Sequence, residues 1–168
     1  FFGLSWLPGY LEQTWDMKLD SVGFASTLPW ALAILLMPIG GWISDSLMRR
    51  TGSTRRARVH LIWICQLLSV LCFIPVIFVE SVTWAVVFIS LAIGFSMAPN
   101  SPYYSICADL FKRRAAAATG IIVTFFSISG VTCPIITGWL AQTGDGFSGA
   151  FTALCIVVAS GVLGMVFF

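Results

Sequence analysis

Charge is what this sequence has least of. Only 10% of its 168 residues are Asp, Glu, Lys or Arg, whereas a soluble domain carries about 25%. The sequence is also 58% hydrophobic, with a mean hydropathy of +0.95. Because the apolar residues recur in long runs along the whole sequence, we expect a multi-pass membrane protein. The same recurrence excludes a secretory signal peptide followed by a soluble domain.

Residues that carry metal or redox chemistry are also scarce. The sequence has one histidine, His60, and five cysteines, none of them in CxxC spacing. All five cysteines lie within apolar runs, where a small buried hydrophobic role is the ordinary interpretation. We therefore expect no metal site and no cofactor.

Six apolar stretches divide the sequence, and about 20 residues suffice for a helix to cross the hydrocarbon core. The expected helices cover 1–11, 22–44, 59–79, 83–110, 115–140 and 150–168. The first stretch has the length of a helix tail only, so we expect the chain to be a piece of a longer protein. The fourth exceeds the core, so we expect Pro99 and Pro102 to kink it and its last turns to leave the bilayer.

Basic residues concentrate in two loops, 46–58 and 111–114, which hold eight of the nine Lys and Arg. Two apolar stretches separate the loops, so both are expected on the same membrane face. The positive-inside rule places that face in the cytoplasm. Five arginines in the first loop also resemble a nucleic-acid patch, but at a membrane surface anionic lipid is the better partner, and we expect no nucleic acid.

The first basic loop contains Gly41, Asp45, Arg49 and Arg50, spaced as Gly-x-x-x-Asp-x-x-x-Arg-Arg. This spacing resembles the cytoplasmic loop signature of the major facilitator superfamily. The second loop, Asp-Leu-Phe-Lys-Arg-Arg at 109–114, is similar to that superfamily's corresponding loop two helices later.

Residues 2–11 resemble the seventh helix of the anion:cation symporter branch of this superfamily. The resemblance implies an all-α membrane protein that forms the carboxy-terminal six-helix half of a twelve-helix bundle, with its first helix truncated. It also implies a secondary active transporter of the bacterial inner membrane and not an enzyme. The implied partners are a small organic anion such as a sugar acid, a coupling cation such as H⁺, the bilayer and the amino-terminal six-helix half.

Two other functions stay open at this point. An exchanger of phosphorylated sugars belongs to the same superfamily, but its substrate would favour paired arginines, which none of the expected helices contains near its middle. An intramembrane serine protease is suggested by Gly-Phe-Ser-Gly at 146–149. Its serine needs a histidine within hydrogen-bond reach, and His60 is expected at the opposite membrane face.

Gly41, Asp45, Arg49 and Arg50 are the candidates for a conformational latch. A carboxylate at position 45 lies at a helix end, where exposed N–H groups at the starts of neighbouring helices attract negative charge. Such a contact would form in one conformation and break in the other. The alternative is a solvated aspartate with no special role.

Polar groups deep in a membrane span often mark a pathway, and 96–104 is the richest such segment. Pro99 and Pro102 leave backbone groups unpaired there, which favours a broken helix that binds substrate. The alternative is polar packing between helices. The candidate substrate-binding residues are Asn100, Ser101, Tyr103, Tyr104, Thr124 at a similar depth, and Trp6, which has a ring suited to stacking.

No Asp, Glu, Lys, Arg or His lies near the middle of any expected span. A proton-coupled anion importer needs a titrating carboxylate and a cation for its substrate. We therefore expect both groups in the amino-terminal half.

Overall fold

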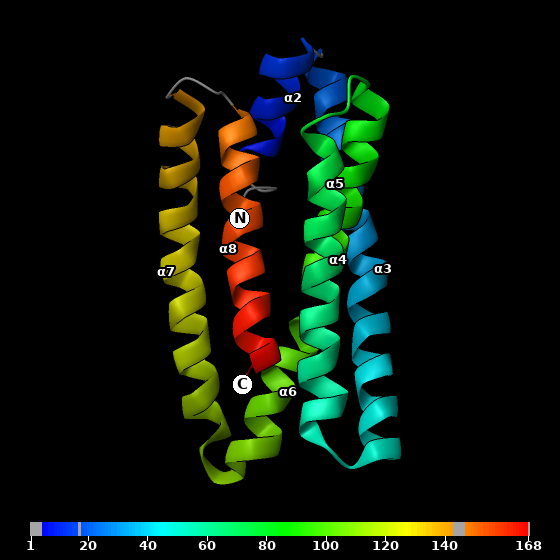
Figure 1. Ribbon diagram of the computed structural model, residues 1–168, viewed down its shortest axis with the longest axis vertical. Helices are drawn as coiled ribbons and strands as arrows, with labels where there is room; N and C mark the ends of the chain where they lie inside the picture. Colours follow the sequence, from blue (N-terminus) through cyan, green and yellow to red (C-terminus); the bar gives the residue numbers. More distant parts are fainter. Residues whose placement is uncertain (1–4, 17, 143–146, 168) are drawn as a thin grey trace.

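The computed structural model describes residues 5–16, 18–142 and 147–167, and helices with short connections make up all of this described chain (Figure 1). The elements are α2 (Leu7–Trp15), α3 (Leu19–Thr51), the π-helical turn η1 (Arg55–Val59), α4 (His60–Val76), α5 (Val82–Met97), α6 (Asn100–Phe111), the 3₁₀ turn η2 (Lys112–Arg114), α7 (Ala115–Gln142) and α8 (Phe147–Phe167).

The long helices run up and down one axis, with the short α2 at one end (Figure 1). Helix α3 descends from the α2 end, α4 returns, and α5 and α6 descend together. Helix α7 then rises and α8 descends. Both arginine-bearing turns, η1 and η2, consequently lie at the same end of the bundle (Figure 1).

Three stretches of the described chain are long and apolar enough to cross a membrane: Asp20–Thr51, Arg55–Val76 and Val82–Leu140. The last of these reverses direction at η2, so it contains two passes (Figure 1). Gly149–Met165 forms a shorter apolar helix. The length and polarity of these segments are those of a multi-pass membrane protein.

Helix α3 is longer than the stretch 22–44 that the apolar pattern predicts. It continues through the first basic segment to Thr51, so only 52–54 separate it from η1. Leucine, methionine and arginine are good helix formers, so loss of apolar character does not end the helix. Gly52 ends it, with a left-handed φ of 62° and its N–H bonded to the Met48 carbonyl.

The expected helix 83–110 is broken into α5 and α6. Pro99 precedes the first residue of α6 and lacks the N–H that would continue α5, so the helix stops at Met97. Pro102 lies in the first turn of α6, where a helix needs no backbone donor. Pro102 therefore favours the start of α6, and only Pro99 interrupts the longer helix.

Helix α2 begins at Leu7 and extends to Trp15, beyond the expected end at residue 11. Pro8 lies in its first turn, a position that suits proline, so it favours the helix start. The predicted residues 1–4 of this helix, and residue 168 of the last one, lie outside the described chain. The remaining ends differ from the predicted ones by a few residues.

Side chains from five helices meet in one buried cluster at the α2 end. Tyr10 of α2 packs edge-on against Phe151 of α8, with ring centroids 5.2 Å apart, and Phe73 of α4 lies 6.0 Å from the same ring. Leu11 and Ile89 are fully buried beside them. This cluster holds α2 beside the ends of α4, α5 and α8.

Glycines allow α3 to approach the α5–α6 break closely. A side chain at Gly40 would overlap the backbone carbonyl of Ala98, within the break. At Gly94 an added Cβ would lie 2.9 Å from the Leu36 side chain and 3.0 Å from that of Leu32. Helix α3 therefore packs directly on the two ends of the broken helix.

Candidate functional site

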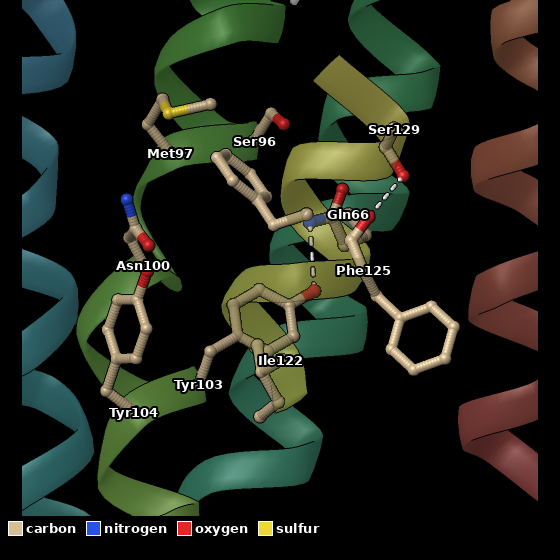
Figure 2. Close-up of a pocket in the computed structure, with 10 residues that line it drawn as sticks. Gln66, Ser96, Met97, Asn100, Tyr103, Tyr104, Ile122, Phe125 and Ser129 are labelled. Atoms are coloured by element: carbon tan, nitrogen blue, oxygen red, sulfur yellow. Dashed lines mark hydrogen bonds between the residues drawn. The ribbon is translucent and has the colours of Figure 1, made fainter. Parts of the chain in front are cut away.

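A pocket of about 320 Å³ opens beside the α5–α6 break, between α4, α5, α6 and α7 (Figure 2). Most of its wall is apolar, and amide and hydroxyl groups are set among aromatic and aliphatic side chains. The lining residues are Gln66, Ser96, Met97, Asn100, Tyr103, Tyr104, Ile122, Phe125, Phe126 and Ser129. We refer to it as the polar pocket.

The helix break determines which side chains reach the polar pocket. Met97 ends α5 and Asn100 begins α6, so the residues on both sides of the break face the same space (Figure 2). The N–H of Tyr103 bonds to the Pro99 carbonyl at 3.1 Å, which fixes the first turn of α6. The Tyr103 ring then lies centrally in the pocket wall (Figure 2).

The lining of the polar pocket, as far as the described residues define it, carries no charged side chain. Asn100 and Gln66 each offer an amide oxygen and an NH₂ group, and the tyrosines and serines offer hydroxyls. These groups can donate to and accept from neutral polar atoms. The pocket is therefore chemically suited to hydroxyl groups, with aromatic rings to cover carbon.

Three of the predicted substrate-binding residues line the polar pocket: Asn100, Tyr103 and Tyr104. Ser101 and Thr124 lie elsewhere. The Ser101 hydroxyl faces α3, where it would lie 3.3 Å from a Cβ built on Gly41. The exposed Thr124 side chain donates to the Gly120 carbonyl of its own helix at 2.9 Å.

Trp6 connects α2 to α7 and does not line the polar pocket. Its indole N–H donates to the Pro134 carbonyl at 3.1 Å. The same ring lies on Gly138, where an added Cβ would come within 2.8 Å of it. The structure therefore places Trp6 at a helix contact.

At the other end of α3, one arginine joins three helices. Arg58 donates from Nη1 to Oδ1 of Asp45 at 2.7 Å and to the Ser44 hydroxyl at 2.8 Å. Its Nε donates to Oδ2 of Asp109 at 3.1 Å. Ser44 in turn donates to the Ala57 carbonyl at 3.1 Å. We call Ser44, Asp45, Arg58 and Asp109 the Arg58 network.

Burial within the Arg58 network is unequal. The Arg58 side chain is 7% exposed, compared with 25% for Asp109 and 60% for Asp45. Arg58 lies in the π-helical turn η1, a geometry that often marks functional positions. Of the predicted latch residues, Asp45 is in the network and Gly41 packs one turn earlier against Ser101.

Arg49 and Arg50, the other predicted latch residues, are exposed at the end of α3. Asp45 pairs with the guanidinium group of the later Arg58, whereas the sequence suggests backbone N–H groups at the starts of neighbouring helices as its partners. Sequence reasoning missed Arg58 because it is one of five arginines in the segment and nothing in its spacing sets it apart. It also missed Gln66, although an amide inside an apolar run is a signal that was available.

The described residues that suggested a serine protease or a metal site are not brought together in the structure. Gly146 of the Gly-Phe-Ser-Gly motif lies outside the described residues, as does the side chain of Ser148. His60 accepts a hydrogen bond from the Trp63 indole at 2.9 Å and is exposed beside η1. Among the described residues, no three His, Cys, Asp or Glu side chains cluster as metal ligands would.

Comparison with known proteins gives one matching family. A sequence model described as Major Facilitator Superfamily matches residues 1–168.

Several curated transporters are also similar to this chain. It is 26% identical to the probable sulfoacetate transporter SauU of Cupriavidus necator, over 98% of this chain and 38% of that protein. It is 33% identical to the probable galactarate/D-glucarate transporter GudP of Escherichia coli, over 89% of this chain and 33% of that protein. The D-galactonate transporter of Escherichia coli is 30% identical, over 97% and 37% respectively. The chain thus spans about a third of the length of these relatives.

Proposed function

This chain belongs to the Major Facilitator Superfamily, whose members are transporters and not enzymes, and on that basis we propose that it is the carboxy-terminal six-helix half of an organic-anion importer. The transporter is secondary active and works by alternating access. Its substrate is a sugar acid or a related carboxylate, and H⁺ is the coupling ion.

The polar pocket is the observation that carries this proposal. It lies beside a broken helix, the kind of element that binds substrate in secondary transporters. Its amide and hydroxyl groups suit the hydroxyls of a sugar acid. The names of three relatives, for galactarate or glucarate, galactonate and sulfoacetate, support an organic anion as substrate.

The charged groups that the reaction needs are assigned to the amino-terminal half. An anionic substrate requires a cation, and proton coupling requires a carboxylate that titrates during the cycle. The described lining of the polar pocket offers neither. The same lack of arginine disfavours a sugar-phosphate exchanger, because phosphate is best bound by paired guanidinium groups.

The Arg58 network is proposed as the conformational latch. It ties the end of α3 to the start of α4 and the end of α6, so these ends cannot separate while it is intact. It lies at the basic end of the bundle, which the positive-inside rule assigns to the cytoplasm of a bacterial inner membrane. Opening of the cytoplasmic side would break the Arg58 network.

Uptake by the full-length transporter in proteoliposomes tests the proposal. Radiolabelled galactonate, glucarate and sulfoacetate are each offered with and without an inward proton gradient. We expect at least one acid to accumulate with the gradient, and a protonophore to abolish the accumulation. Failure to transport any organic acid would contradict the proposal, and gradient-independent exchange of sugar phosphates would favour the alternative.

A further inference from the structure

Gln66 reaches the polar pocket from a helix that otherwise contributes nothing to it. Helix α4 packs mainly against α5 and α8, and Gln66 is its one residue among the described lining of the pocket. An amide in an apolar membrane helix is costly unless its hydrogen bonds are made. The position of Gln66 therefore requires a polar partner.

Tyr103 is that partner. The Gln66 Nε2 group donates to the Tyr103 hydroxyl oxygen at 3.3 Å (Figure 2). Because the amide occupies an acceptor site on this oxygen, the hydroxyl hydrogen of Tyr103 is left to donate elsewhere. An O–H group rotates about its C–O bond, and a donor on one side restricts that rotation. The amide thus sets the direction in which Tyr103 donates.

We propose that Gln66 is a positioning residue for substrate, holding the Tyr103 hydroxyl so that it donates to a hydroxyl oxygen of the transported acid. This inference rests on the proposed function. It deepens that function by assigning to this half the recognition of the substrate's hydroxyl groups, which sets selectivity for hydroxylated acids.

The competing interpretation is a hydrogen bond that only joins α4 to α6, as polar side chains often do in membranes. A purely structural bond needs no open space beside it. Gln66 and Tyr103 instead border a cavity of about 320 Å³, together with the polar side chains of Ser96, Asn100 and Ser129. The open space beside the bond, with further polar side chains in its lining, favours a role towards a ligand.

The test uses the full-length transporter and a double-mutant cycle. Gln66→Met keeps the side-chain length but removes the donor, and Tyr103→Phe removes the hydroxyl. For a hydroxylated sugar acid, we expect each to raise KM about three- to ten-fold, the loss of one hydrogen bond, with little change in maximal rate. The double variant should be no worse than Tyr103→Phe, because both changes remove one contact.

A substrate comparison separates positioning from structural support. We expect KM to stay unchanged in the same variants for a transported acid that lacks the hydroxyls, such as sulfoacetate. A structural defect would impair both substrates alike. Gln13→Met, at an exposed position of α2, is the matched control and should leave both KM values unchanged.

Unchanged KM values, additive effects in the double variant, or equal losses for both acids would overturn the inference. If Gln66→Met does not reach the membrane, Tyr103→Phe still tests the inference, because the absence of a hydroxyl-dependent loss in that variant would overturn it. A wild-type protein that transports no organic acid would refute the proposed function itself. If the wild type is active and the variants keep its KM values, only the role of Gln66 is refuted.

Discussion

Arg58 and Asp45 form an ion pair across 2.7 Å in which the cation is buried and the anion is largely in solvent. The side chains are 7% and 60% exposed respectively. When the pair separates, Asp45 can stay hydrated where it is, whereas Arg58 loses one of its two carboxylate partners in a poorly solvated site. Most of the free-energy cost of breaking the Arg58 network therefore falls on the arginine.

This asymmetry predicts the effect of Arg58→Ala on stability. The substitution removes hydrogen bonds to two carboxylates, and we expect it to lower the free energy of unfolding by about 1–3 kcal/mol, the exposure of Asp45 limiting the loss. The measurement is the apparent Tm of the purified protein in detergent. Arg56→Ala, at an exposed position of the same turn, should leave Tm almost unchanged. Equal shifts in both variants would contradict the prediction.

Asp45→Asn tests the network in function. An amide keeps the size of the side chain but replaces a charge-assisted bond with a weaker neutral one, so we expect transport to fall by about tenfold. The amount of protein in the membrane should not change. Uptake per molecule, quantified by immunoblot, measures the effect.

Asp16→Asn provides the control for that variant. Asp16 is exposed at the opposite end of the bundle, and its left-handed φ of 49° suits asparagine equally well. Transport by the Asp16→Asn variant should equal that of the wild type. A normal rate in Asp45→Asn would show that the carboxylate at position 45 is not part of a latch.

Gly40→Ala should destabilise the protein. The added methyl group would overlap the Ala98 carbonyl, which is backbone and cannot rotate away, so α3 must shift. We expect a loss of about 1–3 kcal/mol, typical of overpacking, measured as a lower apparent Tm. Gly23→Ala, on the same helix with no atom within 4 Å of its added Cβ, should be neutral or slightly stabilising. A similar loss at both glycines would argue against the close approach.

Asn100→Ala should raise KM for a sugar acid by about fivefold, the loss of one hydrogen bond from the polar pocket. Thr124→Val should leave KM unchanged, because that hydroxyl bonds to its own helix at Gly120. Initial rates of uptake over a range of substrate concentrations distinguish the two. The reverse pattern would place the substrate along α7 and not at the helix break.

The proposed membrane orientation predicts how introduced cysteines react. Arg55→Cys and Lys112→Cys should be labelled by a membrane-impermeant maleimide from the cytoplasmic side, and Glu80→Cys from the outer side. The unsubstituted protein gives the background, since its five native cysteines are free thiols. Labelling of positions 55 and 112 from opposite sides would overturn the orientation.

Local patterns in the sequence predicted much of the architecture. Long apolar stretches marked the helices, and the shared family was recognised from the spacing around Asp45, as the match over the whole chain confirms. The polar cluster around Asn100 and Tyr103 was found because its residues are neighbours in sequence. Helix ends were less accurate, because Gly52 and Pro99 set them and hydropathy does not.

The sequence alone does not predict contacts between residues that are far apart in the chain. Arg58 is separated from Asp109 by 51 positions, and Gln66 from Tyr103 by 37. Trp6 is separated from Pro134 by 128. Only the packing of α3, α4 and α6 distinguishes Arg58 from the four exposed arginines of the same segment. The sequence therefore indicated the kinds of residue at each site but not their pairing.

The contact between Gly40 and the Ala98 carbonyl has a mechanical consequence. Asp45 follows Gly40 on the same helix by about 7.5 Å, at a rise of 1.5 Å per residue, while Met97 and Asn100 lie on either side of the Ala98–Pro99 break. Helix α3 therefore rests against the chain at the α5–α6 break, next to residues that line the polar pocket. In the proposed mechanism, a displacement of the Asp45 end of α3 would therefore move the residues at the α5–α6 break, and a substrate bound between them would oppose that displacement.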